Sequence, residues 1–167
     1  FVNIPFRGQH LIRAKMWYGD IKMINNVPHR QDYRFPGVKH MPKMMPWPHL
    51  LTLLRNLVEK HTGIDANNCI ATHYIPRAGI GAHQDKHDAG EFAVFSAGAT
   101  RVLDITTKDG VVVMSIPLEA GSLIYISKEV NGMYYHGIKG MGNSKKAAAH
   151  GDRYSFVFRH FDKYTPL

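Results

Sequence analysis

Two histidines and one aspartate carry the strongest chemical signal in this chain. His83 and Asp85 form a His-x-Asp triplet just after a stretch typical of a β-strand, and His136 follows several such stretches later. Two imidazoles and one carboxylate on one face of an octahedron hold a mononuclear iron(II) ion and leave three positions for a co-substrate and dioxygen. We therefore predict that His83, Asp85 and His136 bind iron(II).

The His-x-Asp triplet is a weak signal when taken alone, because the chain contains eleven histidines. Two further triplets occur, at residues 150–152 and 160–162. The only histidine after His150 is His160, which is too close for a separate strand to intervene, and no histidine follows His160. Only the triplet at His83 therefore has a distant histidine that could complete a metal site.

A strand near the C-terminus carries two arginines on one face. Alternation of side chains over residues 153–159 places Arg153, Ser155 and Arg159 together and puts the aromatic residues on the other face. Buried arginines need an anion, and a guanidinium binds a carboxylate in a bidentate fork. This pattern favours a dicarboxylate ligand; the alternative is that both arginines face solvent.

The surrounding pattern predicts one helix followed by short strands, and hence an α+β domain dominated by an antiparallel sandwich or barrel. The helix is expected from about Pro48 to His61, with Gly63 as its stop. Its apolar stripe is expected to comprise Leu50, Leu53, Leu54, Leu57 and His61. The predicted strands are Ile70–Ile75, Ala93–Ile105, Val111–Pro117, Ser122–Ser127, Met133–Ile138 and Tyr154–Phe161. The segment from Asn25 to Trp47 is loop-like, and it is either functional or contains short strands.

Composition limits the class of protein and its partners. A chain of 167 residues suits one domain, and no apolar run reaches the roughly 18 residues that cross a bilayer. The single cysteine, Cys69, excludes an internal disulfide and suits a reducing intracellular setting, cytoplasmic or nuclear. A net charge of +8 favours nucleic acid as a partner, although many basic proteins are basic for solubility alone. Nothing indicates an obligatory protein partner or a membrane, so we expect a monomer.

Together these residues resemble the AlkB family of 2-oxoglutarate- and iron(II)-dependent dioxygenases, over about Leu11 to Phe161. The segments that carry the resemblance are Arg13–Asp20, Tyr33–Gly37, His83–Lys86, Gly98–Arg101, Gly121–Ile124, Tyr135–Ile138 and Arg153–Arg159. The family fold is a double-stranded β-helix, or jelly roll, with an N-terminal nucleotide-recognition region. The resemblance implies one domain over residues 1–167, with a recognition region at about 1–47 and a β-helix core at about 69–162.

The resemblance also implies roles for individual residues. The metal would be iron(II), the co-substrates 2-oxoglutarate and O2, and the ligands His83, Asp85 and His136. Arg153 would bind the distal carboxylate of 2-oxoglutarate with help from the Tyr74 phenol, and Arg159 would support the end bound to the metal. Thr72 and Ser155 stand where the family usually has asparagines that bind 2-oxoglutarate.

The expected substrate is an alkylated base in DNA or RNA, as in oxidative DNA repair, flipped out and held between aromatic side chains. By position, the substrate-binding residues would be Trp17, Tyr18, Tyr33, Phe35, His87 and Arg101. His87 replaces the acidic residue that repair enzymes commonly place there, which keeps a second substrate class open: a protein side chain, a modified tRNA or a small metabolite. A third possibility is a non-catalytic β-barrel that binds nucleic acid or metal.

Overall fold

The computed structural model describes residues 2–6, 9–31, 43–85, 90–141 and 149–167. Over these residues the chain forms a mostly β fold with a large sheet, a smaller sheet and a three-stranded sheet. The large sheet has, in order, β1 (Val2–Phe6), β2 (Gln9–Gly19), β6 (Asn68–Tyr74), β13 (Arg153–Arg159), β8 (Phe92–Gly98) and β11 (Leu123–Ile126). A short strand, β5 (Met44–Met45), pairs in parallel with β2.

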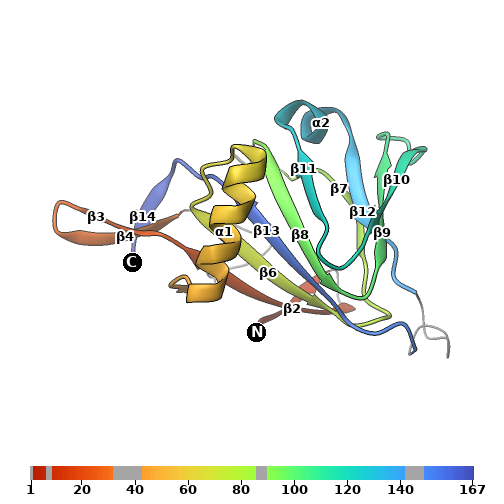
Figure 1. Ribbon diagram of the computed structural model, residues 1–167, viewed down its shortest axis with the longest axis horizontal. Coiled ribbons are helices and arrows are strands. Elements are labelled where there is room, and N and C mark those ends of the chain that lie inside the picture. The colour runs from red at the N-terminus through yellow and green to blue at the C-terminus, as the bar shows by residue number, and fades with distance from the viewer. Residues whose placement is uncertain (1, 7–8, 32–42, 86–89, 142–148) are drawn as a thin grey trace.

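The smaller sheet faces the large one. Its strands, in order, are β10 (Val112–Leu118), β9 (Arg101–Thr106), β12 (Tyr135–Ile138) and β7 (Ile80–His83). Figure 1 shows helix α1 (His49–Thr62) lying across β6, β13 and β8, with β9, β10 and β12 on the far side from the helix. The mostly β architecture of facing sheets confirms the expected α+β, double-stranded β-helix type of fold.

Two apolar clusters hold these layers together. One lies between the large sheet and α1 and includes Leu51, Val58, Cys69 and Phe158. The other lies between the two sheets, where Phe92 and Val94 of β8 meet Leu103 and Ile105 of β9. The large sheet is therefore covered on both faces.

Helix α1 matches the predicted position, but only part of the predicted apolar stripe faces the core. Pro48 precedes the helix, and Gly63 ends it with φ of 76°, a left-handed conformation that glycine adopts without strain. Leu54 of the stripe packs against the cluster that contains the buried Leu51 and Val58, whereas Leu50, Leu53 and Leu57 are exposed. The helix is apolar on more than one side, so its periodicity alone does not identify the buried face.

Two other expectations also need correction. The run Ala93–Ile105 forms two strands, β8 and β9, because Gly98 takes φ of 80° at a turn between them. The expected strand Met133–Ile138 begins only at Tyr135, since a short helix, α2 (Lys128–Met133), precedes it. Ser127 caps α2 by accepting a hydrogen bond from Val130 N at 3.3 Å. Within Asn25–Trp47, the described residues contain the short strands β4 (Val27–Gln31) and β5.

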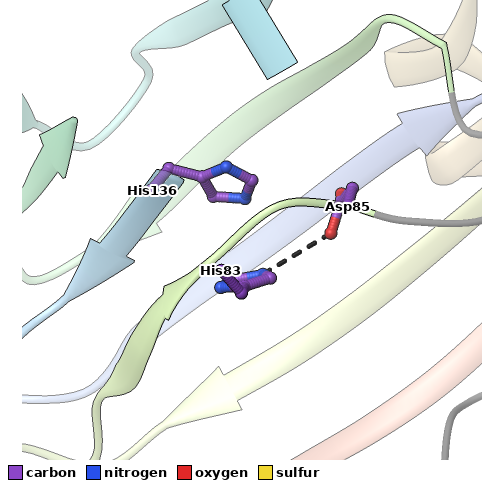
Figure 2. A group of neighbouring side chains, drawn as sticks. All are labelled: His83, Asp85 and His136. Atoms are coloured by element: carbon purple, nitrogen blue, oxygen red, sulfur yellow. Dashed lines mark ion pairs between the residues drawn. The ribbon is translucent and has the colours of Figure 1, made fainter. Parts of the chain in front are cut away.

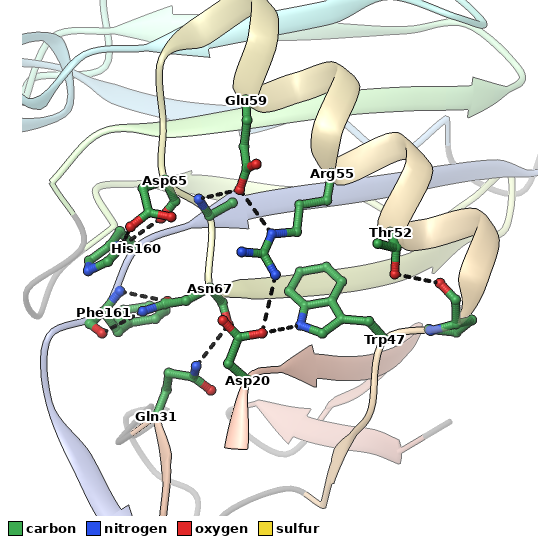
Figure 3. A network of polar contacts seen from close by, with 12 residues as sticks. Asp20, Gln31, Trp47, Thr52, Arg55, Glu59, Asp65, Asn67, His160 and Phe161 are labelled. Atoms are coloured by element: carbon green, nitrogen blue, oxygen red, sulfur yellow. Dashed lines mark hydrogen bonds and ion pairs between the residues drawn. The ribbon is translucent and has the colours of Figure 1, made fainter. Parts of the chain in front are cut away.

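The third sheet, of β14 (Tyr164–Pro166), β4 (Val27–Gln31) and β3 (Ile21–Ile24), is tied to the core by polar side chains. Asp20 accepts hydrogen bonds from Trp47 Nε1 at 2.8 Å and from Arg55 Nη1 at 3.2 Å (Figure 3). Gln31 donates to the carbonyl of Asn67 at 2.8 Å. These contacts fix the start of β3 and the end of β4 beside α1. No described helix has the length and apolar character needed to cross a membrane.

Candidate metal centre and co-substrate pocket

The predicted metal ligands come together at the edge of the smaller sheet. His83 is the last residue of β7, and His136 lies directly opposite it on the antiparallel strand β12. Their ring centroids are 4.4 Å apart, and Asp85 Oδ1 lies 3.5 Å from His83 Nε2. The three ligand atoms all lie within 4.8 Å of one another, and Figure 2 shows the side chains grouped around one point. Strand pairing therefore accounts for the approach of two histidines far apart in sequence.

Both histidines can present a ring nitrogen to a metal ion. His83 Nδ1 lies 2.9 Å from the carbonyl oxygen of Gly81. A proton on Nδ1 makes this a hydrogen bond and leaves the Nε2 lone pair directed to the site. Burial and the neighbouring His83 lower the pKa of His136 to about 4, although Asp85 acts in the opposite direction. His136 is thus a neutral imidazole at neutral pH.

Asp85 is held as an ionised carboxylate. Burial alone would raise its pKa, but Arg159, His83 and His136 outweigh burial and hold the pKa of Asp85 well below its usual range. The Arg159 guanidinium forms an ion pair with Asp85 Oδ2. Two imidazoles and an ionised carboxylate fit a divalent iron ion, and this donor set is the one expected for an iron(II) oxygenase.

The main chain of Asp85 is fixed by a side chain that the sequence analysis did not identify. Asn131, in α2, is 6% exposed; its Oδ1 accepts from Asp85 N at 3.0 Å, and its Nδ2 donates to Asp85 O at 3.0 Å. Both bonds cross between segments far apart in the chain. No sequence motif marks such a contact, because it depends on where α2 lies.

The inner face of β13 carries the arginines as predicted. Arg153, Ser155 and Arg159 are buried, and the intervening Phe158 faces α1. Arg153 Nη2 donates to Ser96 Oγ at 3.0 Å, but its Nε and Nη1 atoms, also buried, have no hydrogen bond of normal geometry among the described residues. Burial lowers the pKa of Arg153, while the nearby Tyr74 opposes this effect. A buried guanidinium with donors to spare suits a carboxylate ligand.

The other predicted co-substrate residues lie beside Arg153. Tyr74 of β6 is directly opposite Arg153, and the Arg153 Cζ atom lies 5.2 Å from the centre of the Tyr74 ring. Thr72 and Ser155 form the next opposed pair, and both are buried. A small cavity of about 70 Å³ is lined by both histidines, Asp85, Ser155 and Arg159, with apolar walls of Phe92, Val94, Leu103, Leu118, Ile126 and Val157. The structure thus brings the metal ligands, at the edge of the smaller sheet, to a cavity that Ser155 and Arg159 of the large sheet also line.

Strand β2 adds two buried cations that the sequence analysis did not assign to the pocket. Arg13 and Lys15 are 7% and 9% exposed and lie opposite Tyr74 and Thr72. Burial, with Arg13 and Arg159, lowers the pKa of Lys15 to about 7, and Asp85 opposes this effect. The alternation of Arg13, Lys15 and Trp17 was the available signal, but it indicates a buried face only if residues 13–17 are recognised as a strand.

The predicted substrate residues are only partly brought to this face. Trp17 is buried beyond Lys15 on β2, whereas Tyr18 faces the cluster under α1 and so lies on the opposite side of the sheet. Arg101 donates to the carbonyl of Pro76 and to Met141 Sδ, both at 3.1 Å. Tyr33, Phe35 and His87 lie outside the described residues.

Comparisons with known proteins agree with this geometry. Residues 3–159 match the family described as the 2OG-Fe(II) oxygenase superfamily. Among solved structures, that of OsALKBH1 has a TM-score of 0.58 at 17% identity, covering 96% of this chain and 84% of that one. A predicted oxalate decarboxylase from Thermotoga maritima has a TM-score of 0.38 at 14% identity, covering 81% and 80%. A search of curated proteins found no match. The chain belongs to the 2OG-Fe(II) oxygenase superfamily, and its fold is AlkB-like.

Proposed function

We propose that this oxygenase removes alkyl groups from bases of DNA or RNA by oxidising them. The observation that carries this proposal is the joining of β2, from the expected recognition region, to β6 of the large sheet. This pairing puts Arg13, Lys15 and Trp17 on the same inner face as Arg153. A net charge of +8 supports a polyanionic substrate.

The bound iron and 2-oxoglutarate supply the oxidising chemistry: O2 is reduced, 2-oxoglutarate loses carbon dioxide to become succinate, and one oxygen atom enters a substrate C–H bond. For an N-methyl group the product is an N-hydroxymethyl group, which releases formaldehyde and leaves an N–H. The protein's task is to bind, orient and exclude water. We assign iron ligation to His83, Asp85 and His136.

The remaining residues would hold these ligands and the co-substrate. Arg153 and Tyr74 bind the distal carboxylate of 2-oxoglutarate, and Thr72 and Ser155 offer hydroxyl groups on the same face. Arg159 keeps the Asp85 carboxylate ionised and oriented. Substituting Arg153 by alanine should therefore weaken 2-oxoglutarate binding more than iron binding; normal co-substrate affinity in this variant would contradict the assignment of the β13 face.

The test of the substrate is direct. The purified protein is incubated with iron(II), 2-oxoglutarate and single- or double-stranded DNA and RNA oligonucleotides that carry methylated bases. Formaldehyde is assayed, and the oligonucleotides are examined by mass spectrometry. We expect loss of methyl groups with equal amounts of formaldehyde and succinate. Succinate without demethylation of any oligonucleotide would contradict the proposal.

A second candidate is oxidation of a small anionic metabolite. The observation that favours it is the presence of buried Arg13 and Lys15 on the face of the sheet whose residues Ser155 and Arg159 line a cavity of only about 70 Å³. Two cations in addition to Arg153 and Arg159 suit a substrate that brings its own negative charge into the pocket. Succinate formation stimulated by a carboxylic acid, and not by oligonucleotides, would favour this candidate.

A further inference from the structure

The inner face of the large sheet carries more positive charge than the metal and 2-oxoglutarate sites account for. Four cationic side chains are buried there: Arg13, Lys15, Arg153 and Arg159. Arg159 is paired with Asp85, and Arg153 is assigned to the distal carboxylate of 2-oxoglutarate. We infer that Arg13 and Lys15 form a separate subsite that binds an oxyanion, a phosphate or a carboxylate, carried by the substrate.

Strand register places this subsite next to the co-substrate site but separate from it. Arg13, Tyr74 and Arg153 are opposed in one row across β2, β6 and β13. The Tyr74 ring separates the two guanidiniums, since the Arg13 Cζ atom is 5.7 Å and the Arg153 Cζ atom 5.2 Å from its centre. A dicarboxylate that joins Arg153 to the metal lies on the β13 side of Tyr74, and Arg13 remains on the β2 side.

The hydrogen-bond donors of Arg13 support a ligand at this place. Its Nε and Nη1 atoms are buried and have no hydrogen-bond partner among the residues that the structure describes. A buried guanidinium normally has its donors satisfied, because an unpaired buried donor destabilises the protein. Stacking on Tyr74 satisfies the face of the guanidinium but not its N–H groups.

Lys15 completes the subsite on the side of the metal. It lies two residues along β2 from Arg13, so both side chains point to the same face of the sheet. Lys15 is opposite Thr72, which in turn is opposite Ser155, and Ser155 lines the cavity together with His83 and Asp85. An oxyanion bound by Arg13 and Lys15 would therefore sit beside the metal centre, where it could fix the reacting carbon of the substrate.

The inference rests on the proposed function in one respect, that 2-oxoglutarate occupies Arg153. It can be tested without turnover by isothermal titration calorimetry on the protein loaded with zinc(II) and N-oxalylglycine. Two pairs of probes differ in the oxyanion: adenosine 5′-monophosphate against adenosine, and N-acetylglycine against N-acetylglycinamide. The first pair represents a phosphate source and the second a carboxylate source. A failed demethylation assay leaves this measurement intact, so the two failures are distinguishable.

We expect at least one oxyanion probe to bind tenfold or more tightly than its neutral counterpart. Arg13→Gln should abolish this preference and Lys15→Met should reduce it, while both variants keep N-oxalylglycine affinity within about twofold. Arg153→Gln should lose N-oxalylglycine affinity instead. Lys22→Met removes the same charge from an exposed residue of β3 and should change neither measurement.

Three results would overturn the inference. One is equal binding of charged and neutral probes in the wild-type protein. Another is an oxyanion preference that survives both the Arg13 and the Lys15 substitutions. The third is a loss of N-oxalylglycine affinity in Arg13→Gln as large as that in Arg153→Gln, which would assign Arg13 to the co-substrate. If Arg13→Gln does not fold, Lys15→Met still tests the oxyanion preference. Arg13→Lys, which keeps the charge but removes the guanidinium fork, then tests whether N-oxalylglycine affinity depends on Arg13.

Discussion

The two faces of the large sheet both contain fully buried side chains, but these differ in their chemistry. On β13, Phe158 and Arg153 are both 0% exposed, and they point to opposite faces. Phe158 packs with Cys69 and Val58 beneath α1. Arg153 lies with Ser155 and Ser96 on the face that leads to the metal ligands.

On β13, the residues that stabilise the fold and the residues expected to bind ligands therefore lie on opposite faces. Burial of an aromatic ring removes apolar surface from water and stabilises the fold. Burial of guanidinium and ammonium groups destabilises it unless an anion is present. The outer face, beneath α1, therefore holds the fold together. The inner face, toward the smaller sheet, carries unfavourable positive charge that an anionic co-substrate and an anionic substrate would neutralise.

The largest effect should come from removing a metal ligand on the inner side. We expect His136→Ala to lower turnover of 2-oxoglutarate to below about 1% of wild type, because two protein ligands no longer hold iron in the reactive geometry. Thermal unfolding of the metal-free protein should change little, since the site does not stabilise the fold. Succinate assays and calorimetric metal titration check both points. His61→Ala, an exposed histidine at the end of α1, is the matched control and should keep full activity.

A substitution on the outer face, beneath α1, should have the reverse effect: lower stability with unchanged ligand binding. Phe158→Ala should lower the free energy of unfolding by about 3–5 kcal/mol, because it leaves a cavity beneath α1. N-oxalylglycine affinity, measured where the variant is folded, should stay close to wild type. Phe158→Leu retains most of the volume and should cost less. A change below about 1 kcal/mol for Phe158→Ala, measured by urea unfolding, would contradict the assignment of this face to stability.

The sequence revealed those parts of the site that depend on local spacing. His83, Asp85 and Arg153 stand in short motifs whose strand context is visible, and Pro48 and Gly63 mark the ends of α1. It was harder to predict which face of an element is buried than to predict where the element lies in the sequence. The exposed leucines of α1 follow the same periodicity as the buried ones, so only packing against the sheet decides between them.

Residues whose roles depend on tertiary contacts were not predicted, and the reason is physical. Lysine is usually exposed, so the alternation of Arg13, Lys15 and Trp17 was not enough to predict that Lys15 is buried. Asn131 lies in a segment expected to precede a strand, and its role depends on α2 placing its amide against the main chain of Asp85. Such contacts join segments whose approach no local pattern encodes.

Substitution of Lys15 should have a smaller effect, and it tests whether the buried positive charge on the inner face lowers the stability of the fold. Its pKa is about 7 in the folded, metal-free protein and near 10.5 in the unfolded chain. Between these values the unfolded chain binds more protons, so stability should rise as the pH rises from 7 towards 10. Lys15→Met should remove this dependence and raise the free energy of unfolding at pH 7 by about 1–3 kcal/mol.

Urea unfolding at pH 7 and at pH 9.5 measures both effects for Lys15. The gain from Lys15→Met should be smaller at the higher pH, where the wild-type amine is already neutral. Lys22→Met should leave stability and its pH dependence unchanged, since Lys22 is exposed. A loss of stability in Lys15→Met at pH 7 would show that the amine makes a net favourable contact, and the contrast between the two faces would weaken accordingly.

The smallest expected effect concerns Asn131, which positions a ligand without touching the metal. Asn131→Ala should weaken metal affinity by about tenfold, because the main chain of Asp85 loses both hydrogen bonds that fix it. Asn131→Asp keeps an acceptor for Asp85 N but loses the donor to Asp85 O, so it should fall between alanine and wild type. Calorimetric titration with cobalt(II), and the visible absorption of the cobalt(II) protein, report affinity and ligand geometry.

The control for Asn131 is Ser127, the N-cap residue of the same helix. Ser127→Ala removes the cap of α2 but no contact with Asp85, so it should lower stability while leaving cobalt(II) affinity and absorption nearly unchanged. If Ser127→Ala weakened cobalt(II) binding as much as Asn131→Ala does, the effect of Asn131 would come from general loosening of α2. A shifted absorption spectrum in the Asn131 variants alone would instead show that this amide sets the position of the Asp85 carboxylate. Hydrogen bonds would then order the polar side of the large sheet, whereas packing orders its apolar side.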